Sequence, residues 1–464
     1  MKATSNGTIK FGDNEIPFLF NDEKDLLTIY FGNKCIEIPE QLNGIVAHES
    51  DKMVGGYIYY SLALPLSASD CLLVTGEGAK SVATGIHNAE VEFYIENYQS
   101  STIYNEIRFQ FAELDYFIPS KSLVEIKNDQ FVFSRIKKNL YTFKIDYCGH
   151  KIAVSFDLKA ECKTSVNAKA STISEVTIQF PETDDLEYII GLYLRVRSFF
   201  SFVCNRKNIG LRSAIIYGNY ISKTIDENKE HVDAYITTKQ NIHFSQKYIE
   251  PMEGEKKIEK TLNVKYFASK LPELFQLFFE KNSTEDAVVN SNSIHHSLKY
   301  RNLIDLEQSL HITAAFEHYV KTLLPEMSSK STLEFYGDVG KLLEKYIADT
   351  TGKKQKKAKK FLKGLTPQIP LEGKILKVCN GYTGWASLSS IASELFNGEE
   401  IATLAREANA WRNELAHDKR EYVPSIEVIK AIRLVEHLNY AIVLRYAGYN
   451  DDETKEILRD LLAR

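Results

Sequence analysis

The stretch IATLAREANAWRNELAH, residues 401–417, decides how the C-terminal part of the chain is expected to fold. Its apolar residues recur at intervals of three and four, namely Ile401, Leu404, Ala405, Ala408 and Leu415. This spacing predicts one amphipathic helix with a single apolar face. Asp418-Lys419-Arg420 and Pro424 come next, so we expect the helix to end near residue 417.

Arg412 falls on the apolar face of this helix, four residues after Ala408 and three before Leu415. A guanidinium on a packed face needs a partner or a cleft, because burying an unpaired charge is costly. His417 follows five residues later, about 140° away on an ideal helix at roughly 100° per residue. Either the helix ends near Ala416, or a site combines groups from two copies of it.

The residue types of this motif suit the cleavage of RNA. A histidine that titrates near neutral pH can take a proton from a ribose 2′-OH or donate one to the leaving 5′-oxygen. Arg412 can bind the phosphate and stabilise the charge of a pentacoordinate phosphorane, and Asn413 can orient either group. DNA has no 2′-OH, so the motif predicts RNA cleavage, a 2′,3′-cyclic phosphate product and no metal or other cofactor.

A structural interpretation of the same residues is simpler. Arg412 could pair with a glutamate, and His417 could cap a helix C-terminus. An arginine and a histidine at this spacing also occur readily by chance, so the motif alone favours the structural interpretation.

Residues 1 to about 180 are expected to form many short strands, because segments rich in β-branched and aromatic residues alternate with turn signals. Such a series predicts a sandwich or a barrel-like domain. The expected strands are 9–12, 16–20, 27–31, 56–60, 91–95, 107–111, 131–133, 141–145, 152–156 and 176–180. The strand at 27–31 should stop at Gly32-Asn33.

One helix is expected within the β-rich part, at residues 186–205. Thr183-Asp184-Asp185 before it are residue types suited to an N-cap. The helix is apolar on most sides, so it should pack into the β domain. Further strands are expected at Ala214–Tyr217 and Tyr235-Ile236.

The polar stretch 251–260 is the expected domain boundary. The fold class is therefore α+β, with a β-rich domain at 1–255 and an all-helical domain at 261–464. The expected helices of the second domain are 267–280, 298–324, 332–348, 388–396, 399–416 and a last long helix from Pro424 to Gly448.

The amino-acid composition limits the classes of protein to which the chain can belong. The chain has 464 residues, of which 44% are hydrophobic and 26% are charged, as in globular proteins. It has no run of about 18 apolar residues, no apolar leader and no CxxC pair among its six cysteines. We therefore expect a cytoplasmic protein with reduced thiols and no membrane partner.

The net charge of −5 does not suggest general nucleic-acid binding, but the charge is uneven. The C-terminal domain contains a dense run of lysines that could hold RNA phosphates or could be a solvated surface. These lysines are Lys353, Lys354, Lys356, Lys357, Lys359 and Lys360. Arg406 is another candidate RNA contact, although a surface salt bridge is the simpler interpretation.

His311 and His318 lie seven residues apart on an expected helix, with Glu317 beside them. A metal site would need a third ligand that the sequence does not place, so we predict no metal site.

Two stretches of the helical part resemble the HEPN ribonucleases. Arg412-Asn413-Glu414-Leu415-Ala416-His417, late in a helical domain and followed by one long helix, resembles their motif of an arginine, a polar residue, a few spacers and a histidine. Residues 306–317 resemble the family's early core helix with its glutamate, here Glu317. The β-rich front resembles the N-terminal domain of ApeA-type antiphage proteins.

This resemblance implies a C-terminal HEPN helical bundle with Arg412 and His417 as catalytic residues, Asn413 in support and Glu317 as a supporting acid. Two HEPN domains would pair as a homodimer and form a composite cleft. The resemblance also implies a bacterial defence protein, in which a phage-derived trigger that the sequence does not name acts through the N-terminal domain. Cleavage of cellular RNA, with tRNA as one candidate, would then halt growth.

The sequence also allows two alternatives. The helical domain could only dimerise or bind RNA, as in a non-catalytic regulatory or adaptor protein whose β domain binds a ligand. Alternatively, the aromatic-rich β half could be a carbohydrate- or peptide-binding module.

Overall fold

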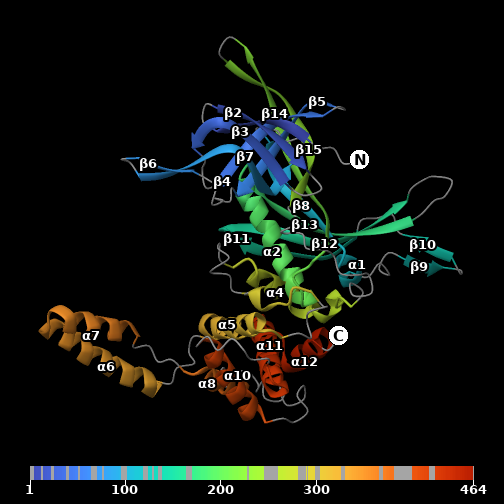
Figure 1. The fold of residues 1–464 in the computed structure, drawn as a ribbon. Coiled ribbons are helices and arrows are strands. Elements are labelled where there is room, and N and C mark those ends of the chain that lie inside the picture. Colours follow the sequence, from blue (N-terminus) through green and yellow to red (C-terminus); the bar gives the residue numbers. More distant parts are fainter. Residues whose placement is uncertain are drawn as a thin grey trace. The chain divides into compact units, whose positions relative to one another are not determined.

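In the computed structural model the chain forms two compact units (Figure 1). The β unit comprises residues 1–200 and 208–263, and the helical unit comprises 201–207 and 264–464. The domain limits 1–255 and 261–464 stay a prediction. The structure describes residues 5–11, 14–21, 26–37, 41–50, 53–63, 71–75, 78–95, 102–118, 124–127, 130–133, 138–162, 170–226, 229–244, 260–280, 289, 291–297, 304–324, 330–364, 369–380, 400–416 and 424–462.

Antiparallel strands form most of the β unit. The bounds are β1 Ser5–Phe11, β2 Asn14–Asn21, β3 Leu26–Glu37, β4 Gln41–Ser50, β5 Met53–Ala63, β6 Cys71–Thr75, β7 Gly78–Ile95, β8 Thr102–Phe111, β9 Val124–Lys127, β10 Gln130–Phe133, β11 Lys138–Tyr147, β12 His150–Cys162, β13 Ala170–Thr183, β14 Leu211–Asp226 and β15 Lys229–Phe244. The main sheet has the order β11-β12-β13-β8-β14-β15-β7-β3-β2-β1-β4-β5, with β6 beside β7, and β9 pairs with β10.

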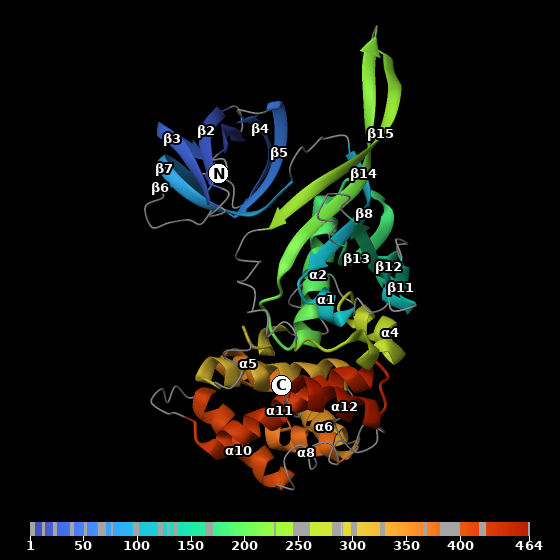
Figure 2. The same ribbon diagram turned by 90° about the vertical axis from the view of Figure 1, so that its right-hand side faces the viewer.

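Strand pairing is cyclic at one end of this sheet (Figure 2). β1 pairs with β2 and β4, β3 pairs with β2 and β7, and β5 pairs with β4 and β7. The other end is the antiparallel series from β11 to β15 in the order given above. The predicted β-rich N-terminal architecture is therefore confirmed.

The prediction that the strand at 27–31 stops at Gly32-Asn33 is wrong. β3 continues to Glu37 and keeps pairing with β7. Gly32 has a φ of +64°, and the register shifts on both sides of it. Glycine adopts positive φ without steric cost, so here it produces an irregularity within a strand, where the sequence suggested a turn.

Helix α2 (Leu186–Cys204) begins where the sequence predicted. Asp185 Oδ1 accepts a hydrogen bond from the Tyr188 backbone N–H at 3.1 Å, which satisfies one of the unpaired donors at the helix start. Phe200 is fully buried, and its ring centroid lies 5.1 Å from that of Phe111 on β8 and 5.6 Å from that of Phe117 on α1 (Leu114–Phe117). The apolar surface of α2 thus packs into the β unit, as expected.

The helical unit contains the predicted all-α architecture. Its elements are η2 Val264–Tyr266, η3 Ala268–Lys270, α4 Leu271–Leu277, η4 Ser291–Ser293, α5 Leu306–Leu323, α6 Lys330–Asp349, α7 Gly352–Gly364, α8 Leu371–Cys379, α10 Ile401–Ala416, α11 Ile426–Tyr446 and α12 Asp451–Leu462. Among the residues that the structure describes, no helix is long and apolar enough to cross a membrane.

Several helix limits differ from the prediction. Of the helix expected at 298–324, residues 298–303 lie outside the described residues, and α5 begins at Leu306. The extended Asp305 caps α5 by accepting a hydrogen bond from the Gln308 N–H at 2.7 Å. In place of the helix expected at 267–280, the structure has one 3-10 turn, η3, followed by the short helix α4, whose start carries a proline. Helices α7, α8 and α12 were not predicted, and the helix expected at 388–396 lies outside the described residues.

The core of the helical unit lies around α11, which packs against α5, α10 and α12 (Figure 1). Ile432 and Val435 of α11, Phe316 of α5, and Ala405 and Ala408 of α10 are completely buried. The small alanines let α10 approach its neighbours closely, which fixes the position of the motif helix.

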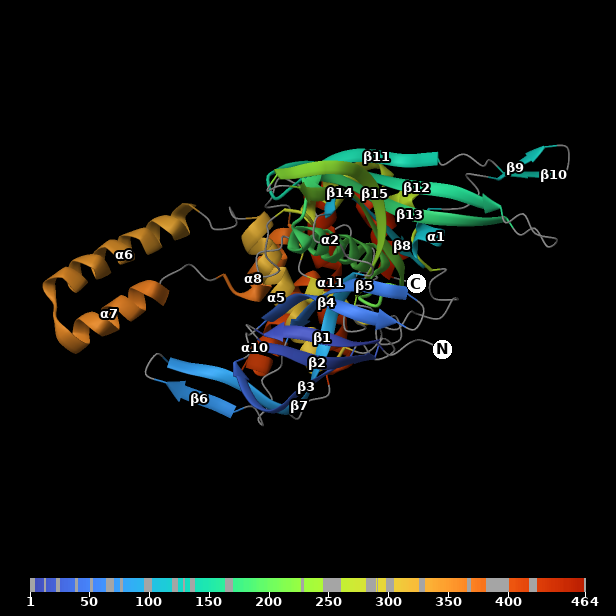
Figure 3. The same cartoon turned by 90° about the horizontal axis from the view of Figure 1, so that it is seen from above.

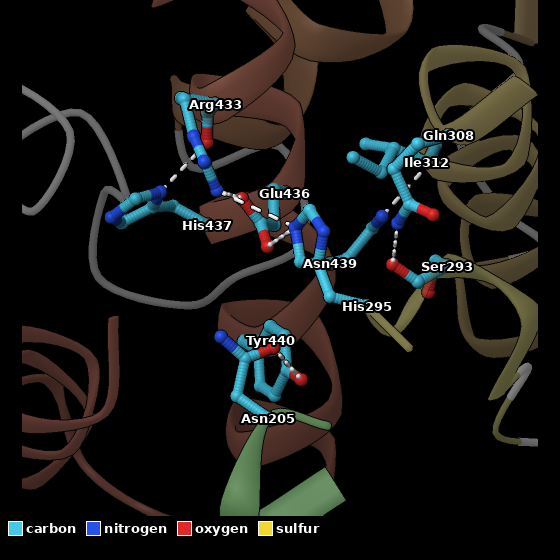
Figure 4. Close-up of polar contacts among 10 residues, drawn as sticks. All are labelled: Asn205, Ser293, His295, Gln308, Ile312, Arg433, Glu436, His437, Asn439 and Tyr440. Atoms are coloured by element: carbon cyan, nitrogen blue, oxygen red, sulfur yellow. Dashed lines mark hydrogen bonds and ion pairs between the residues drawn. The ribbon is translucent and has the colours of Figure 1, made fainter. Parts of the chain in front are cut away.

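A buried ionic cluster lies within this core, and we name it the Glu436 cluster (His295, Arg433 and Glu436) (Figure 4). Glu436 Oε1 lies 2.9 Å from His295 Nε2, and Oε2 accepts a hydrogen bond from Arg433 Nη1 at 2.6 Å. Burial by itself would raise the pKa of Glu436, but the hydrogen bond with His295 and the charge of Arg433 lower it to about 2. The cluster connects α11 to the segment that precedes α5.

Candidate active site

Arg412 is at the edge of the packed face of α10. Leu404, Ala405, Ala408 and Trp411 are buried, whereas the Arg412 side chain is 38% exposed. The apolar periodicity of residues 401–415 therefore places the backbone of Arg412 against the core and its guanidinium partly in solvent.

The partner of Arg412 is Glu317 on α5. Arg412 Nη2 donates a hydrogen bond to Glu317 Oε2 at 3.2 Å, across 95 positions of the sequence. Phe316 and Val320 on the same helix are buried, so α5 is fixed by packing and presents Glu317 at the boundary of the core. Arg412 thus has a partner, and its pair with a glutamate is the one that the structural interpretation of the sequence predicted.

Lys374 on α8 binds the second oxygen of the same carboxylate. Its Nζ lies 2.9 Å from Glu317 Oε1, and its side chain is 22% exposed. Leu371, Ile375 and Val378 are buried and hold α8 against α10. We name Glu317, Lys374 and Arg412 together the Glu317 cluster. Three helices that are distant in sequence contribute one residue each to it.

The two cations determine the ionisation of Glu317. Burial acts to raise its pKa, but the hydrogen bonds and charges of Lys374 and Arg412 outweigh burial and lower the pKa below its usual value. Glu317 is therefore a carboxylate at neutral pH. In this state it can hold and orient cations, but it has no proton to donate.

The structure also shows where the other predicted site residues lie. Asn413 and Arg406 are exposed on α10, and His417 lies outside the described residues. The prediction that the helix ends at the histidine stays a prediction. His311 and His318 are half-buried on α5, and the described part of the chain contains no group of three or more side chains that could hold a metal ion.

The lysine run is helical and lies on α7, which pairs with α6 (Figure 3). Ala358 is buried, and all six predicted lysines around it are exposed, namely Lys353, Lys354, Lys356, Lys357, Lys359 and Lys360. The run is therefore one dense positive surface on a helical hairpin.

Lys374 was not singled out from the sequence. The available signal was the spacing of Leu371, Ile375 and Val378, which is that of a short amphipathic helix. This pattern could have predicted α8. It could not have predicted that Lys374 meets Glu317, 57 positions earlier in the chain.

Residues 310–453 match the family described as Apea-like HEPN. The matched region contains Glu317, Lys374 and Arg412, as well as His417. No curated protein and no solved structure matches the chain.

An Apea-like HEPN domain with a β-rich unit before it agrees with the resemblance found in the sequence. HEPN domains are generally ribonucleases, and this family suggests a nuclease-type role in antiphage defence. They also generally act on RNA and form dimers.

Proposed function

We propose that this protein is a metal-independent endoribonuclease of bacterial antiphage defence. Its catalytic residues are Arg412 and His417, with Asn413 in support. His417 moves the protons of the 2′-OH and of the 5′-leaving group, and Arg412 binds the phosphate. The bond from the 2′-oxygen to phosphorus forms as the bond to the 5′-oxygen breaks, which leaves a 2′,3′-cyclic phosphate.

The observation that supports this proposal most strongly is the exposure and orientation of the Arg412 guanidinium. Its guanidinium is partly exposed, yet it is oriented by Glu317 within the region that matches the Apea-like HEPN family. An arginine has five N–H donors, and one bond to a carboxylate leaves others for a phosphate. An oriented, accessible guanidinium is what the binding of a transition-state phosphorane requires.

The complete site is a composite cleft between two HEPN domains of a homodimer. Arg412 and His417 are about 140° apart on an ideal helix at roughly 100° per residue, so one straight helix cannot direct both toward one phosphate. With a two-fold axis beside α10, the motifs of two copies face one cleft. One phosphate can then contact residues from both copies.

The exposed lysines of α7 are the proposed RNA-docking surface. From Lys353 to Lys360 the run contains six lysines and no acidic residue, and all six lysines are exposed. Such a surface attracts a polyanion without reading its sequence. It suits a folded cellular RNA such as tRNA, with Arg406 of α10 as a further contact. The β unit is proposed to sense a phage-derived trigger and to restrain or release the nuclease.

The experiment is induction of the full chain in bacteria, followed by gels of total RNA and mapping of the cut ends. Wild type should cut RNA, leave 2′,3′-cyclic phosphate ends and stop growth. His417→Ala and Arg412→Ala should lower cleavage by at least about a hundredfold, since each removes a group that acts in the transition state.

Two substitutions serve as matched controls. His311→Ala removes a histidine of α5, and Arg459→Ala removes an exposed arginine of α12 that is paired with Asp460 at 3.6 Å. Both should cut RNA as wild type does. Undiminished cleavage by His417→Ala would refute the proposal. RNA binding without any cleavage would instead support a non-catalytic adaptor.

A further inference from the structure

We infer that Lys374 is a second phosphate-binding cation of the active site, beside Arg412. The inference rests on the proposed function of Arg412 and extends it to a residue of another helix. Lys374 and Arg412 bind the two oxygens of one carboxylate, Glu317, at 2.9 and 3.2 Å. Glu317 thus brings two cations to one location, both of them partly exposed.

The charges of the Glu317 cluster do not cancel. One ionised carboxylate faces one ammonium and one guanidinium, so the cluster carries a net charge of about +1 at neutral pH. Arg412 alone would already neutralise Glu317. Lys374 therefore provides an excess positive charge, which favours the binding of an anion at this location.

Both cations keep hydrogen-bonding capacity for such an anion. An ammonium has three donors and a guanidinium five, and a carboxylate that takes one bond from each leaves most of them for other acceptors. Their geometries are complementary, because arginine presents a planar fork and lysine a compact point charge. The two cations on one carboxylate are thus suited to bind the two non-bridging oxygens of a phosphate.

A purely structural role explains Lys374 less well. Its pair with Glu317 is partly exposed, and exposed pairs contribute only about 0–1 kcal/mol to stability. The buried Leu371, Ile375 and Val378 already fix α8. A lysine at the edge of the core, directed at the carboxylate that orients Arg412, is better explained by what it adds to the site.

Lys374 acts by binding and takes no part in proton transfer. A phosphodiester carries one negative charge, and the phosphorane formed by attack of the 2′-oxygen carries a second. A cation that binds the non-bridging oxygens stabilises the added charge, so it affects the rate of cleavage more than the affinity for RNA.

Cleavage of a defined RNA by the purified full chain, under single-turnover conditions, tests this inference. Lys374→Gln should lower the cleavage rate by roughly a hundredfold, with a much smaller loss of RNA affinity. Lys374→Arg should restore most of the rate, because it returns the charge. Lys270→Gln, which removes an exposed lysine paired with Glu273, should behave as wild type.

A second measurement does not depend on cleavage. Inorganic phosphate should raise the thermal unfolding temperature of wild type, because a ligand that binds only the folded state stabilises it. The rise should be smaller for Lys374→Gln and unchanged for Lys270→Gln. Equal rises for wild type and Lys374→Gln would contradict a phosphate site at Lys374.

The outcomes separate this inference from the proposed function. If Lys374→Gln cleaves RNA as wild type does while Arg412→Ala is inactive, Lys374 is not part of the site and the proposed function stands. If wild type and Arg412→Ala cleave equally, the proposed function fails. In that event the phosphate measurement still decides whether Lys374 binds the anion.

Discussion

Two glutamates of the helical unit each bind two basic side chains, yet their surroundings are opposite. Glu436 lies between His295 and Arg433, and both Glu436 and His295 are only 2% exposed. Glu317 lies between Lys374 and Arg412, and its side chain is 28% exposed. In both clusters a carboxylate lies between two basic side chains, and the two carboxylates differ in burial.

This difference separates a structural cluster from a candidate site. A buried carboxylate loses its hydration and depends on its partners, so removal of any member is costly, and a ligand cannot reach it. A partly exposed carboxylate keeps much of its hydration, and its partners contribute little to stability. The side chains of the Glu317 cluster are therefore available for binding an anion.

The largest expected contrast is in the free energy of unfolding. Glu436→Ala leaves His295 and Arg433 without their common carboxylate and should cost about 3–5 kcal/mol. Glu317→Ala should cost less than about 1 kcal/mol, while it lowers RNA cleavage because Arg412 loses the group that orients it. Urea unfolding of both variants checks this, and equal losses of stability would remove the distinction between the clusters.

A smaller contrast is expected in the dependence of stability on pH. Folding lowers the pKa of Glu436 from 4.5 to about 2, so its contribution is complete above pH 4.5 and is lost as pH falls toward 2. The loss is on the order of 3 kcal/mol, at about 1.4 kcal/mol per pKa unit.

Unfolding in urea between pH 6 and pH 3 measures this dependence. Glu436→Gln should flatten the decline of stability in acid, since an amide does not titrate. Glu317→Gln should change the decline much less, because solvent screens the partly exposed Glu317 cluster. A decline that Glu436→Gln leaves unaltered would contradict the assignment to Glu436.

The smallest expected effect is the coupling within the Glu317 cluster. A double-mutant cycle of Glu317→Gln and Arg412→Gln should give an interaction energy of about 0.2–1 kcal/mol in unfolding, as for other exposed pairs. Thermal unfolding of the four proteins measures it. A coupling of several kcal/mol would show that Arg412 is a structural residue, and this result would weaken the proposed function.

Local patterns in the sequence predicted much of the fold. The periodicity of residues 401–415 predicted α10, and Pro424 and Gly448 bracket α11. The apolar run after Asp185 predicted α2. Errors occurred where a local signal had two possible outcomes. Gly32 suggested a turn but lies within β3, and a helix was expected at residues 304 and 305, whereas Asp305 is the cap of a helix that begins at Leu306.

By itself, the sequence determined that Arg412 needs a partner or a cleft, because burying an unpaired guanidinium on the packed face of a helix is costly. It also determined that Arg412 and His417 cannot share one face of a straight helix, because that follows from helical geometry alone. The tertiary structure decided which carboxylate meets Arg412 and that Lys374 shares it. Those contacts join residues 95 and 57 positions apart, and they depend on how α5, α8 and α10 pack together. No local pattern in the sequence encodes that packing.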